Sequence, residues 1–458
     1  MIIVSHRGPF TFVRRPDGSF EARRGAGGVV SALGPLLAGQ GHLWVAAAMT
    51  DGDRDALREG AAGSDEIDVV LLDIDPALHR LHYDVISNSV LWFLHHDMFD
   101  LPRRPRFDQR FREAWEAYVE VNRIFARAVT DRAADGDVVL VQDYQLALVP
   151  GIIRVARPDL RVLHFNHTPF CGPDAIRVLP DMAVRELCAS MGGGPAGFHT
   201  ERWAARYRAS VQEVLGFEPP AFVASFGPDR VALEQVAASP ETAAALEVLE
   251  AQVGDRPLLL RTDRIEPSKN IVRGFLAYDL LLEQHPEWRD RVTFVALLYP
   301  SRESLLEYLA YGQEVEQAAA RVNERWARDD WLPVIVDSRD DYPRSVAGLR
   351  RYDVLLVNPM KDGLNLVAKE GPMVNQSDGV LCLSREAGAF DELGDAALAV
   401  HPYDLEQTAA TLHAALSMDP AERRTRAATL KERAGARTAH DWLVDQLRAC
   451  GVDVDSVS

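Results

Sequence analysis

Short apolar runs that alternate with helix-length segments restrict the fold of this chain more than any other feature. In the second half, such runs occupy residues 258–260, 292–298, 334–336, 354–357 and 380–383. Runs at 2–4, 138–141 and 162–165 lie in the first half, where a helical pattern covers about 108–134. Continuous apolar runs are typical of strands buried on both faces. The pattern predicts an α/β fold with helices on both faces of parallel sheets.

The length of the chain predicts two domains, because 458 residues exceed what one hydrophobic core usually organises. Between Pro219 and Pro240 there is little periodicity, and several Pro and Gly residues interrupt the chain. Such residues punctuate regular structure, so we expect the crossing between domains here. The predicted domains are 1–232 and 233–440, and 441–458 forms a C-terminal helix and tail.

Composition limits the classes of partner. The formal net charge of −18 argues against a general affinity for nucleic acid or for an anionic membrane. An anionic ligand therefore requires a local cluster of Arg and Lys. The first residues form neither a signal sequence nor a span, so we expect a cytoplasmic protein. The four cysteines lie far apart and are expected to be reduced packing residues.

No metal or cofactor is expected. Several Asp-x-Asp triplets occur, for example at Asp73/Asp75 and Asp135/Asp137, but chance explains them in a chain with 68 acidic residues. None follows a clear buried strand, as a site for a divalent cation and a nucleotide would require. The adjacent His95 and His96 diverge on either a helix or a strand, so they do not predict a metal site.

Polar residues follow three apolar runs of the first half: Arg7, Asp143 and His167. Ligands of open α/β sheets bind at the carboxyl ends of the strands. Asp143 and His167 can bind sugar hydroxyls there, although a structural Asp and a core-edge His explain them equally well.

Residues 81–99 are rich in aromatic residues and His. Tyr83 and Trp92 flank 87–89, and lining a ligand and packing in the core remain equally open for them. The loop at 25–28, which contains Gly27 and Gly28, opens a helix and would let backbone amides approach a phosphate. On its own this loop is more typical of a flexible surface turn.

Basic residues follow two runs of the second half. Arg264 and Lys269, five apart on a predicted loop, can converge on a pyrophosphate, with Arg as a planar donor fork and Lys as a mobile charge. Arg302 follows a further strand and is a third candidate. In an acidic protein, two cations just past a buried strand favour an anion site over a solvated basic loop.

Residues 361–370 follow the run at 354–357 and predict a strand, a tight turn at Asp362-Gly363 and the start of a helix. The first amides of that helix point out unpaired and attract phosphate or sugar oxygens. Taken alone, the stretch also fits an ordinary connection between a strand and a helix.

Together these motifs resemble the trehalose-6-phosphate synthases in order and spacing through nearly the whole chain, and the match at 362–370 is the most specific. The resemblance implies a retaining, metal-independent glycosyltransferase of the GT-B architecture, with two facing Rossmann-like domains. The N-terminal domain would hold glucose 6-phosphate and the C-terminal domain a nucleotide-glucose. The C-terminal helix around 439–449 would pack back on the first domain.

The resemblance also assigns roles. Arg264 and Lys269 would neutralise the pyrophosphate of the donor, and Gly27 or Gly28 would close over it. The helix-start residues Asn365 and Leu366 would support the donor. The remaining implied contacts are Glu370 with the ribose, Asp362 with the transferred glucose, Arg7, Tyr83 and Arg302 with the acceptor phosphate, and Trp92, Asp143 and His167 with the two sugars.

The chain departs from the family pattern at three places. His6 stands where Asn is usual, and Ala47 replaces the second Trp of an early Trp-x-x-Trp motif that begins at Trp44. Residues 266–270 read Glu-Pro-Ser-Lys-Asn in place of Asp-Tyr-Ser-Lys-Gly. The loop at 337–341 is expected to meet the donor base, and Asp340 can accept from the ring and amino N–H groups of guanine. We therefore predict that GDP-glucose is preferred over UDP-glucose.

Two other functions remain open from the sequence. A related transferase would use glycerol 3-phosphate or a cyclitol phosphate as the acceptor. A catalytically silent sensor would bind the same sugar phosphates without turnover. In each case the expected partners are small molecules and neither nucleic acid nor membrane, and the sequence leaves a homo-oligomer open.

Overall fold

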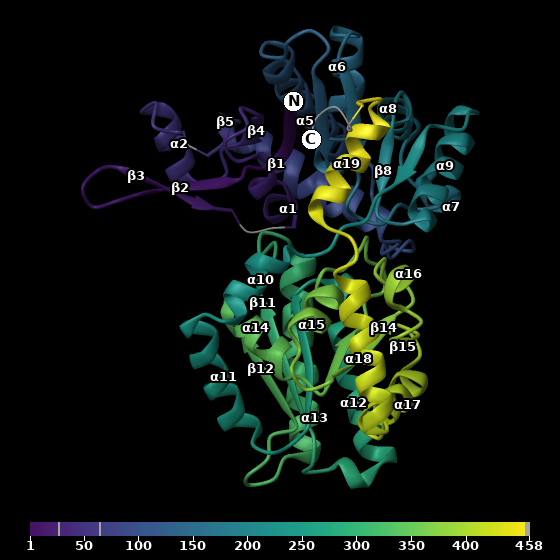
Figure 1. Cartoon of the computed structure of the whole chain (residues 1–458). Helices are drawn as coiled ribbons and strands as arrows, with labels where there is room; N and C mark the ends of the chain where they lie inside the picture. Colours follow the sequence, from purple (N-terminus) through teal and green to yellow (C-terminus); the bar gives the residue numbers. More distant parts are fainter. Residues whose placement is uncertain (26–27, 64–65, 454–458) are drawn as a thin grey trace. The chain divides into compact units, whose positions relative to one another are not determined.

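The computed structural model describes residues 1–25, 28–63 and 66–453 (Figure 1). The chain forms two compact units, one of Met1–Phe226 together with the chain from Ala439 onward, the other of Gly227–Thr438. The change of unit lies at 226/227, six residues before the predicted crossing at 232/233. In the segment that was expected to lack regular structure, the chain forms strand β9 (Ala221–Val223) and helix α10 (Arg230–Ala237).

The first unit is built on a seven-stranded, fully parallel sheet with the order β5-β4-β1-β6-β7-β8-β9. The predicted runs are confirmed as central strands, and sequence analysis missed the outer ones. The strands are β1 (Ile2–Arg7), β4 (Leu43–Ala47), β5 (Asp68–Leu72), β6 (Val138–Gln142), β7 (Arg161–Phe165), β8 (Ala196–Phe198) and β9. Apolar side chains from β1, β4 and β6 pack with those of helix α5 (Gln109–Thr130), which corresponds to the pattern at 108–134.

Other elements of this unit surround the sheet. They are the hairpin β2 (Phe10–Arg14) and β3 (Phe20–Arg24), and the helices α1 (Gly28–Leu37), α2 (Asp51–Arg58), α3 (Pro76–Arg80), α4 (Trp92–His95), α6 (Val149–Ala156), α7 (Pro173–Ile176), α8 (Asp181–Gly192), α9 (Glu201–Leu215) and α19 (Ala439–Ala449). A π-helix, η1 (Leu81–Leu91), and a 3₁₀ turn, η2 (Tyr144–Leu146), complete it. The π-helix occupies the stretch rich in aromatic residues, and such helices are frequent at functional sites.

The second unit has a six-stranded parallel sheet with the order β12-β11-β10-β13-β14-β15. All five predicted runs form strands, and β15 is additional. The strands are β10 (Leu258–Arg264), β11 (Thr293–Tyr299), β12 (Val334–Ser338), β13 (Val354–Val357), β14 (Val380–Ser384) and β15 (Leu398–Val400). Because β11 and β13 flank β10, the loops after these three strands lie next to one another.

Helices cover both faces of this second sheet, as the apolar runs predict. On one face, Leu259 and Phe294 pack with helices α12 (Ile271–Gln284), α13 (Leu306–Trp326) and α17 (Leu405–Leu416). On the other face, Gly348 of helix α14 (Tyr342–Arg351) lies against Leu260 and Leu297. The remaining helices and turns are α11 (Pro240–Val253), η3 (Pro267–Lys269), η4 (Pro286–Trp288), α15 (Val367–Val374), α16 (Phe390–Leu393) and α18 (Pro420–Ala434).

Among the residues that the structure describes, every helix is too short or too polar to cross a bilayer.

Candidate functional site

In the second unit, the candidate site forms where the loops after β10 and β13 run side by side. Asn270 Nδ2 donates to the carbonyls of Asn358 (3.0 Å) and Pro402 (2.6 Å), and the Met360 amide donates to the carbonyl of Ser268 (2.8 Å). Asn270 adopts the left-handed conformation with φ 59°, which Asn tolerates better than most residues. This explains physically how Asn can stand where the family usually has Gly.

The two loops bring Lys269 and Asp362 together, although 93 positions separate them in the sequence. Lys269 Nζ donates to Asp362 Oδ2 at 2.5 Å, and Asn365 Nδ2 donates to the same oxygen at 3.0 Å. Burial disfavours the charged ammonium of Lys269, but the carboxylates of Asp362 and Glu266 outweigh this effect and hold its pKa above the ordinary value. Lys269 therefore keeps its positive charge in the folded protein.

Arg264 was predicted to lie on a loop, but it is the last residue of β10. The strand runs four residues beyond the apolar run that identified it. Its Nε lies 3.2 Å from Glu266 Oε2, and Arg302 Nη1 lies 3.8 Å from the same oxygen. Glu266 is only 2% exposed and chiefly accounts for the raised pKa of Arg264. Arg302 also donates to the Tyr308 hydroxyl. Sequence analysis assigned no role to Glu266, and the only signal was its replacement of Asp in the family pattern.

Residues 358–366 form a longer loop than the tight turn that was predicted, and α15 begins at Val367. Backbone hydrogen bonds fix this loop to the segment after β14: Asp362 N–H donates to Glu386 (3.1 Å), and Gly388 N–H donates to Asp362 (3.1 Å). A Cβ on Gly388 would lie 2.0 Å from the Gly363 carbonyl oxygen, so only glycine allows this approach. The position of Asp362 therefore depends on two backbone segments.

At the start of α15, internal acceptors engage the amides of Ala368, Lys369 and Glu370. Asn365 has a positive φ of 75° and its Oδ1 accepts from the amide of Ala368 at 3.1 Å. The carbonyl of Leu366 accepts from the amides of Lys369 and Glu370, each at 2.8 Å. The partial positive charge at the start of a helix favours an anionic ligand near this end of α15.

Glu370 and Tyr342 form a pair at the edge of this site. The Tyr342 hydroxyl donates to Glu370 Oε1 at 3.4 Å, and the Tyr342 side chain is 46% exposed. Burial raises the pKa of Glu370 to about 7, although the hydrogen bond from Tyr342 opposes this. Glu370 is thus a carboxylate whose ionisation is costly until hydrogen-bond donors reach it.

The loop that was predicted to meet the donor base has one unengaged carboxylate. Asp337 is paired with Arg339 and Arg344, and Asp341 caps α14 by accepting from the Arg344 amide at 3.0 Å. Asp340, between them, is exposed and has no ion pair or hydrogen bond with other described residues. Its side chain is available to a ligand.

In the first unit, Arg7 ends β1 with an exposed side chain. The preceding His6 is buried, and its ring stacks on Tyr83 with centroids 4.5 Å apart and planes 5° apart. His6 Nε2 also lies 3.0 Å from His79 Nε2. Burial, followed by the fields of His82, His79 and Arg7, lowers the pKa of His6 well below its usual value. A neutral His therefore occupies the position at which the family usually has Asn.

For Trp92, Gly27 and Gly28, the structure gives less support for the predicted contacts with a ligand. Trp92 is 2% exposed and stacks on His96 with centroids 4.1 Å apart, which favours core packing over the ligand-lining alternative. Gly28 is the first residue of α1, whereas Gly27 lies outside the described residues.

Asp143 has a backbone conformation that non-glycine residues rarely adopt, with φ 69° and ψ 168°. Three contacts hold it there. Its carbonyl accepts from His164 Nε2 (3.0 Å), its amide donates to the Phe165 carbonyl (2.7 Å), and its carboxylate accepts from the His167 amide (3.2 Å). Strain of this kind, of roughly 1–3 kcal/mol, typically marks functional positions.

His167 differs from the simple expectation of a sugar-binding ring, because internal partners engage both of its nitrogens. Nδ1 lies 3.1 Å from His199 Nε2, and Nε2 lies 3.0 Å from Gln142 Oε1. Burial, followed by His199 and His164, lowers its pKa well below the usual value, so the ring is neutral. Sequence analysis missed both partners, although Gln142 and His199 also stand at strand ends.

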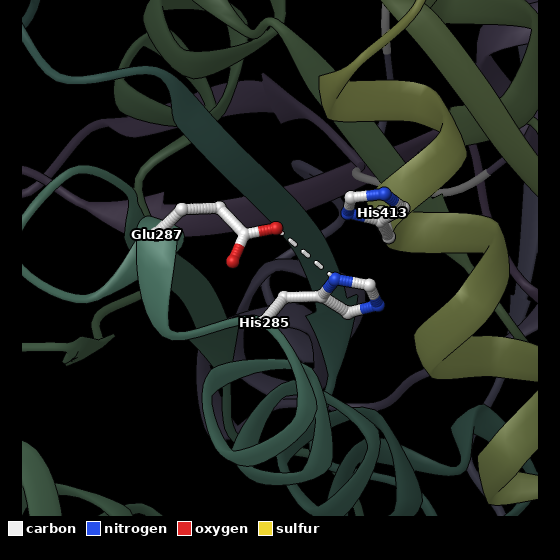
Figure 2. Close-up of side chains that lie close together, drawn as sticks. All are labelled: His285, Glu287 and His413. Carbon is white, nitrogen blue, oxygen red and sulfur yellow. Dashed lines mark hydrogen bonds and ion pairs between the residues drawn. The ribbon is translucent and has the colours of Figure 1, made fainter.

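Among the described residues, a group of two His and one Glu has ligand atoms within 4.8 Å of one another, and it lies at the other edge of the second sheet (Figure 2). It comprises His285, Glu287 and His413, close to where the chain enters β11. The His rings are stacked with centroids 3.6 Å and planes 10° apart, so their in-plane lone pairs run side by side and do not converge. Glu287 Oε1 lies 3.2 Å from His285 Nδ1, and Trp288 donates to His413 Nδ1 at 3.0 Å. This group is a packing contact, separate from the candidate site.

Known proteins match this chain over nearly its whole length. Residues 1–450 match Glycosyltransferase family 20. A trehalose-6-phosphate synthase from Mycobacterium avium is 34% identical, and the match covers 96% of this chain and 93% of that protein.

Two solved structures share the fold, each covering 98% of this chain and 99% of the other. An E. coli structure bound with UDP-2-fluoro glucose has a TM-score of 0.82 at 26% identity. An alpha,alpha-trehalose-phosphate synthase (UDP-forming) from Burkholderia xenovorans, in complex with glucose-6-phosphate, has a TM-score of 0.83 at 26% identity. These matches confirm the resemblance and the GT-B architecture that were predicted from the sequence.

Proposed function

Because the chain belongs to glycosyltransferase family 20, we propose that it transfers glucose from a nucleotide-glucose to glucose 6-phosphate, which gives α,α-trehalose 6-phosphate. The observation that carries this proposal is the assembly of Arg264, Lys269, Asp362 and Glu370 at one edge of the sheet, where β10 ends, the loops after β10 and β13 meet and α15 begins. Similar structures hold a nucleotide-sugar analogue or glucose-6-phosphate, which supports the two substrate classes.

The residue types suit the chemistry of this transfer. The bond between C1 of glucose and the diphosphate oxygen breaks, and C1 forms a new bond to the 1-hydroxyl oxygen of glucose 6-phosphate. Arg264, Lys269 and the first amides of α15 stabilise the negative charge that develops on the departing diphosphate. Asp362 holds the transferred glucose by accepting from its hydroxyls. Positioning of the two substrates supplies much of the rate.

We propose that transfer retains the configuration at C1 and needs no metal. The acceptor attacks from the face that the diphosphate leaves, and the leaving phosphate oxygen takes the proton of the acceptor hydroxyl. The ionised Arg264 and Lys269 supply the positive charge that a divalent cation would otherwise provide. Unchanged turnover after chelation by EDTA and an α,α-linked product support these points, whereas restoration of lost turnover by Mg²⁺ contradicts the second.

For the donor base, we propose that GDP-glucose is preferred over UDP-glucose. The argument rests on Asp340, whose exposed carboxylate can accept two hydrogen bonds from the ring and amino N–H groups of guanine. Uracil offers a single ring N–H. The Burkholderia relative is UDP-forming, so the comparison of the two donors is decisive. A higher kcat/KM with UDP-glucose would overturn this preference, and Asp340→Asn tests the role of the carboxylate.

One product assay tests the function as a whole. Glucose 6-phosphate is offered with a panel of nucleotide-glucoses, and both the released nucleoside diphosphate and the sugar product are identified. Transfer only to glycerol 3-phosphate or to a cyclitol phosphate would establish the related transferase. Binding of GDP-glucose and glucose 6-phosphate without release of GDP would establish a sensor.

A further inference from the structure

The C-terminal helix α19 places a buried amide against the sheet of the first unit. Gln446 is 0% exposed, and its Oε1 accepts from Gln142 Nε2 at 3.2 Å. One turn earlier on the helix, the buried Trp442 packs edge-on against Phe165 with ring centroids 5.1 Å apart and lies 5.5 Å from His167. Residues more than 270 positions apart thus form one cluster beneath the strand ends that carry Asp143 and His167 (α19 in Figure 1).

The donor and the acceptor of each hydrogen bond in this cluster can be assigned by starting from Gln446. Gln446 Nε2 donates to the carbonyl of Trp442 at 3.4 Å, and a carbonyl can only accept. This orients the Gln446 amide, so that its oxygen faces Gln142. Gln142 must then donate through Nε2, which leaves its oxygen as an acceptor toward His167. A flipped amide at either Gln would bring two oxygens or two donors together.

The same assignment extends to the imidazole ring of His167. Because Gln142 Oε1 only accepts, the proton of the neutral His167 ring resides on Nε2. His167 Nδ1 is then an acceptor, and the Nε2–H group of His199 donates a hydrogen bond to it at 3.1 Å. The ring is therefore held from both sides in one tautomer. The backbone amide of His167 donates to the Asp143 carboxylate at 3.2 Å.

We propose that Gln446 of α19 is a positioning residue: through Gln142 it sets the tautomer and ring orientation of His167, the residue whose backbone amide donates to the strained Asp143 carboxylate. Where hydrogen-bond partners orient a metal-bound His in a comparable way, their loss typically costs about 10–100-fold in metal affinity or activity. The effect on transfer rests on the proposed function, whereas the tautomer of His167 does not.

The test compares two substitutions at one position in the full chain. Gln446→Leu removes the acceptor, so the Gln142 amide is free to flip. Gln446→Glu keeps an acceptor facing Gln142. The buried Leu443→Ala is the control, because it removes packing from the same helix without changing an amide. Long-range ¹H–¹⁵N spectra of histidine-labelled protein report the tautomer, and His167→Asn identifies the signals of His167.

We expect the Nε2–H form of His167 in the unmodified protein, in Gln446→Glu and in Leu443→Ala, and a mixture of tautomers in Gln446→Leu. We also expect kcat to fall at least tenfold in Gln446→Leu, with KM for both substrates changing less than twofold. An unchanged tautomer in Gln446→Leu would overturn the proposal. Equal losses of kcat in Gln446→Leu and Leu443→Ala would reduce α19 to a packing element. A changed tautomer in Gln446→Leu, together with no glucose transfer by the unmodified protein, would instead count against the proposed function.

Gln142→Glu tests the contact between residue 142 and His167 in the same series of hydrogen bonds. This variant replaces Gln446→Leu in the test if Gln446→Leu does not fold. A carboxylate at this position lies next to His167 Nε2 and should raise the pKa of the ring. A His167 titration that appears between pH 5 and 8 in Gln142→Glu supports the contact, and its absence there contradicts it.

Discussion

Replacement of Glu370 by Gln should make the protein more stable at alkaline pH. The same replacement should weaken binding of the donor. Burial raises the pKa of Glu370 to about 7, against an ordinary value of 4.5. The folded state therefore favours the protonated carboxyl. The stability that this group contributes is fully present below pH 4.5 and is lost as the pH rises through 7. Gln does not ionise, so the variant escapes this loss.

The magnitude follows from the two pKa values. A tenfold change in an ionisation equilibrium corresponds to about 1.4 kcal/mol, so ionised Glu370 costs the folded state about 3 kcal/mol above pH 8. Most of this cost arises between pH 5 and 8.5. Over that range we expect the stability of Glu370→Gln to increase relative to the unmodified protein by about 2–3 kcal/mol.

Urea unfolding at pH 5 and pH 8.5, followed by circular dichroism, measures this difference. Glu316→Gln is the control, since it makes the same change at an exposed position of α13 in the same unit. A stability difference between Glu370→Gln and the unmodified protein that does not depend on pH would refute the reasoning. The donor measurement is separate: the KM for nucleotide-glucose should rise in Glu370→Gln, because an amide offers the ribose hydroxyls only one acceptor oxygen.

Substitutions at three further positions, Asp362, Gly388 and Asp143, test the geometry of the site. Asp362→Ala should lower kcat about 100-fold or more without unfolding the chain, as circular dichroism would show, and near-normal turnover would return 361–370 to an ordinary connection. Gly388→Ala forces a Cβ to within 2.0 Å of a carbonyl oxygen, so a displacement of about 1 Å near Asp362 should cost roughly 100-fold in kcat/KM. Gly312→Ala, whose Cβ would meet only an ordinary 3.7 Å contact, should leave kcat/KM unchanged. Both Asp143→Gly and Asp143→Ala should lose transfer, but only Gly adopts φ 69° and ψ 168° without strain, so thermal unfolding should show the Gly variant to be more stable by about 1–3 kcal/mol. An Ala variant as stable as the Gly variant would show that Asp143 is unstrained.

Residues that sequence analysis placed at strand ends illustrate what was predictable. Lys269 and Asp362 were both identified because each follows a buried run, and parallel strands carry their following residues to one edge. Their direct contact at 2.5 Å was not predicted, since it depends on β10 and β13 being neighbours. The order of strands in a sheet is not contained in the apolar pattern of any one strand.

Other features were out of reach for a related reason. The outer strands β8, β9 and β15 have three residues each, too few for a period to stand out. Glu266 was assigned no role because its importance comes from burial next to Arg264 and Arg302, which belong to different strands and loops. From the sequence, lining a ligand and packing in the core were equally open for Trp92, because the stack on His96 depends on the turn geometry of η1 and α4.

By itself, the sequence determined the α/β class, the central strands, and the residues delivered to the strand ends, because apolar runs and turn residues act through local propensity and burial. Only the tertiary structure decided which of those residues meet. It pairs Lys269 with Asp362, it holds Asp362 against Gly388, and it places Gln446 of α19 behind His167. These contacts join segments that are distant along the chain, and the energy of a buried charge or amide is set by the partners that folding brings to it.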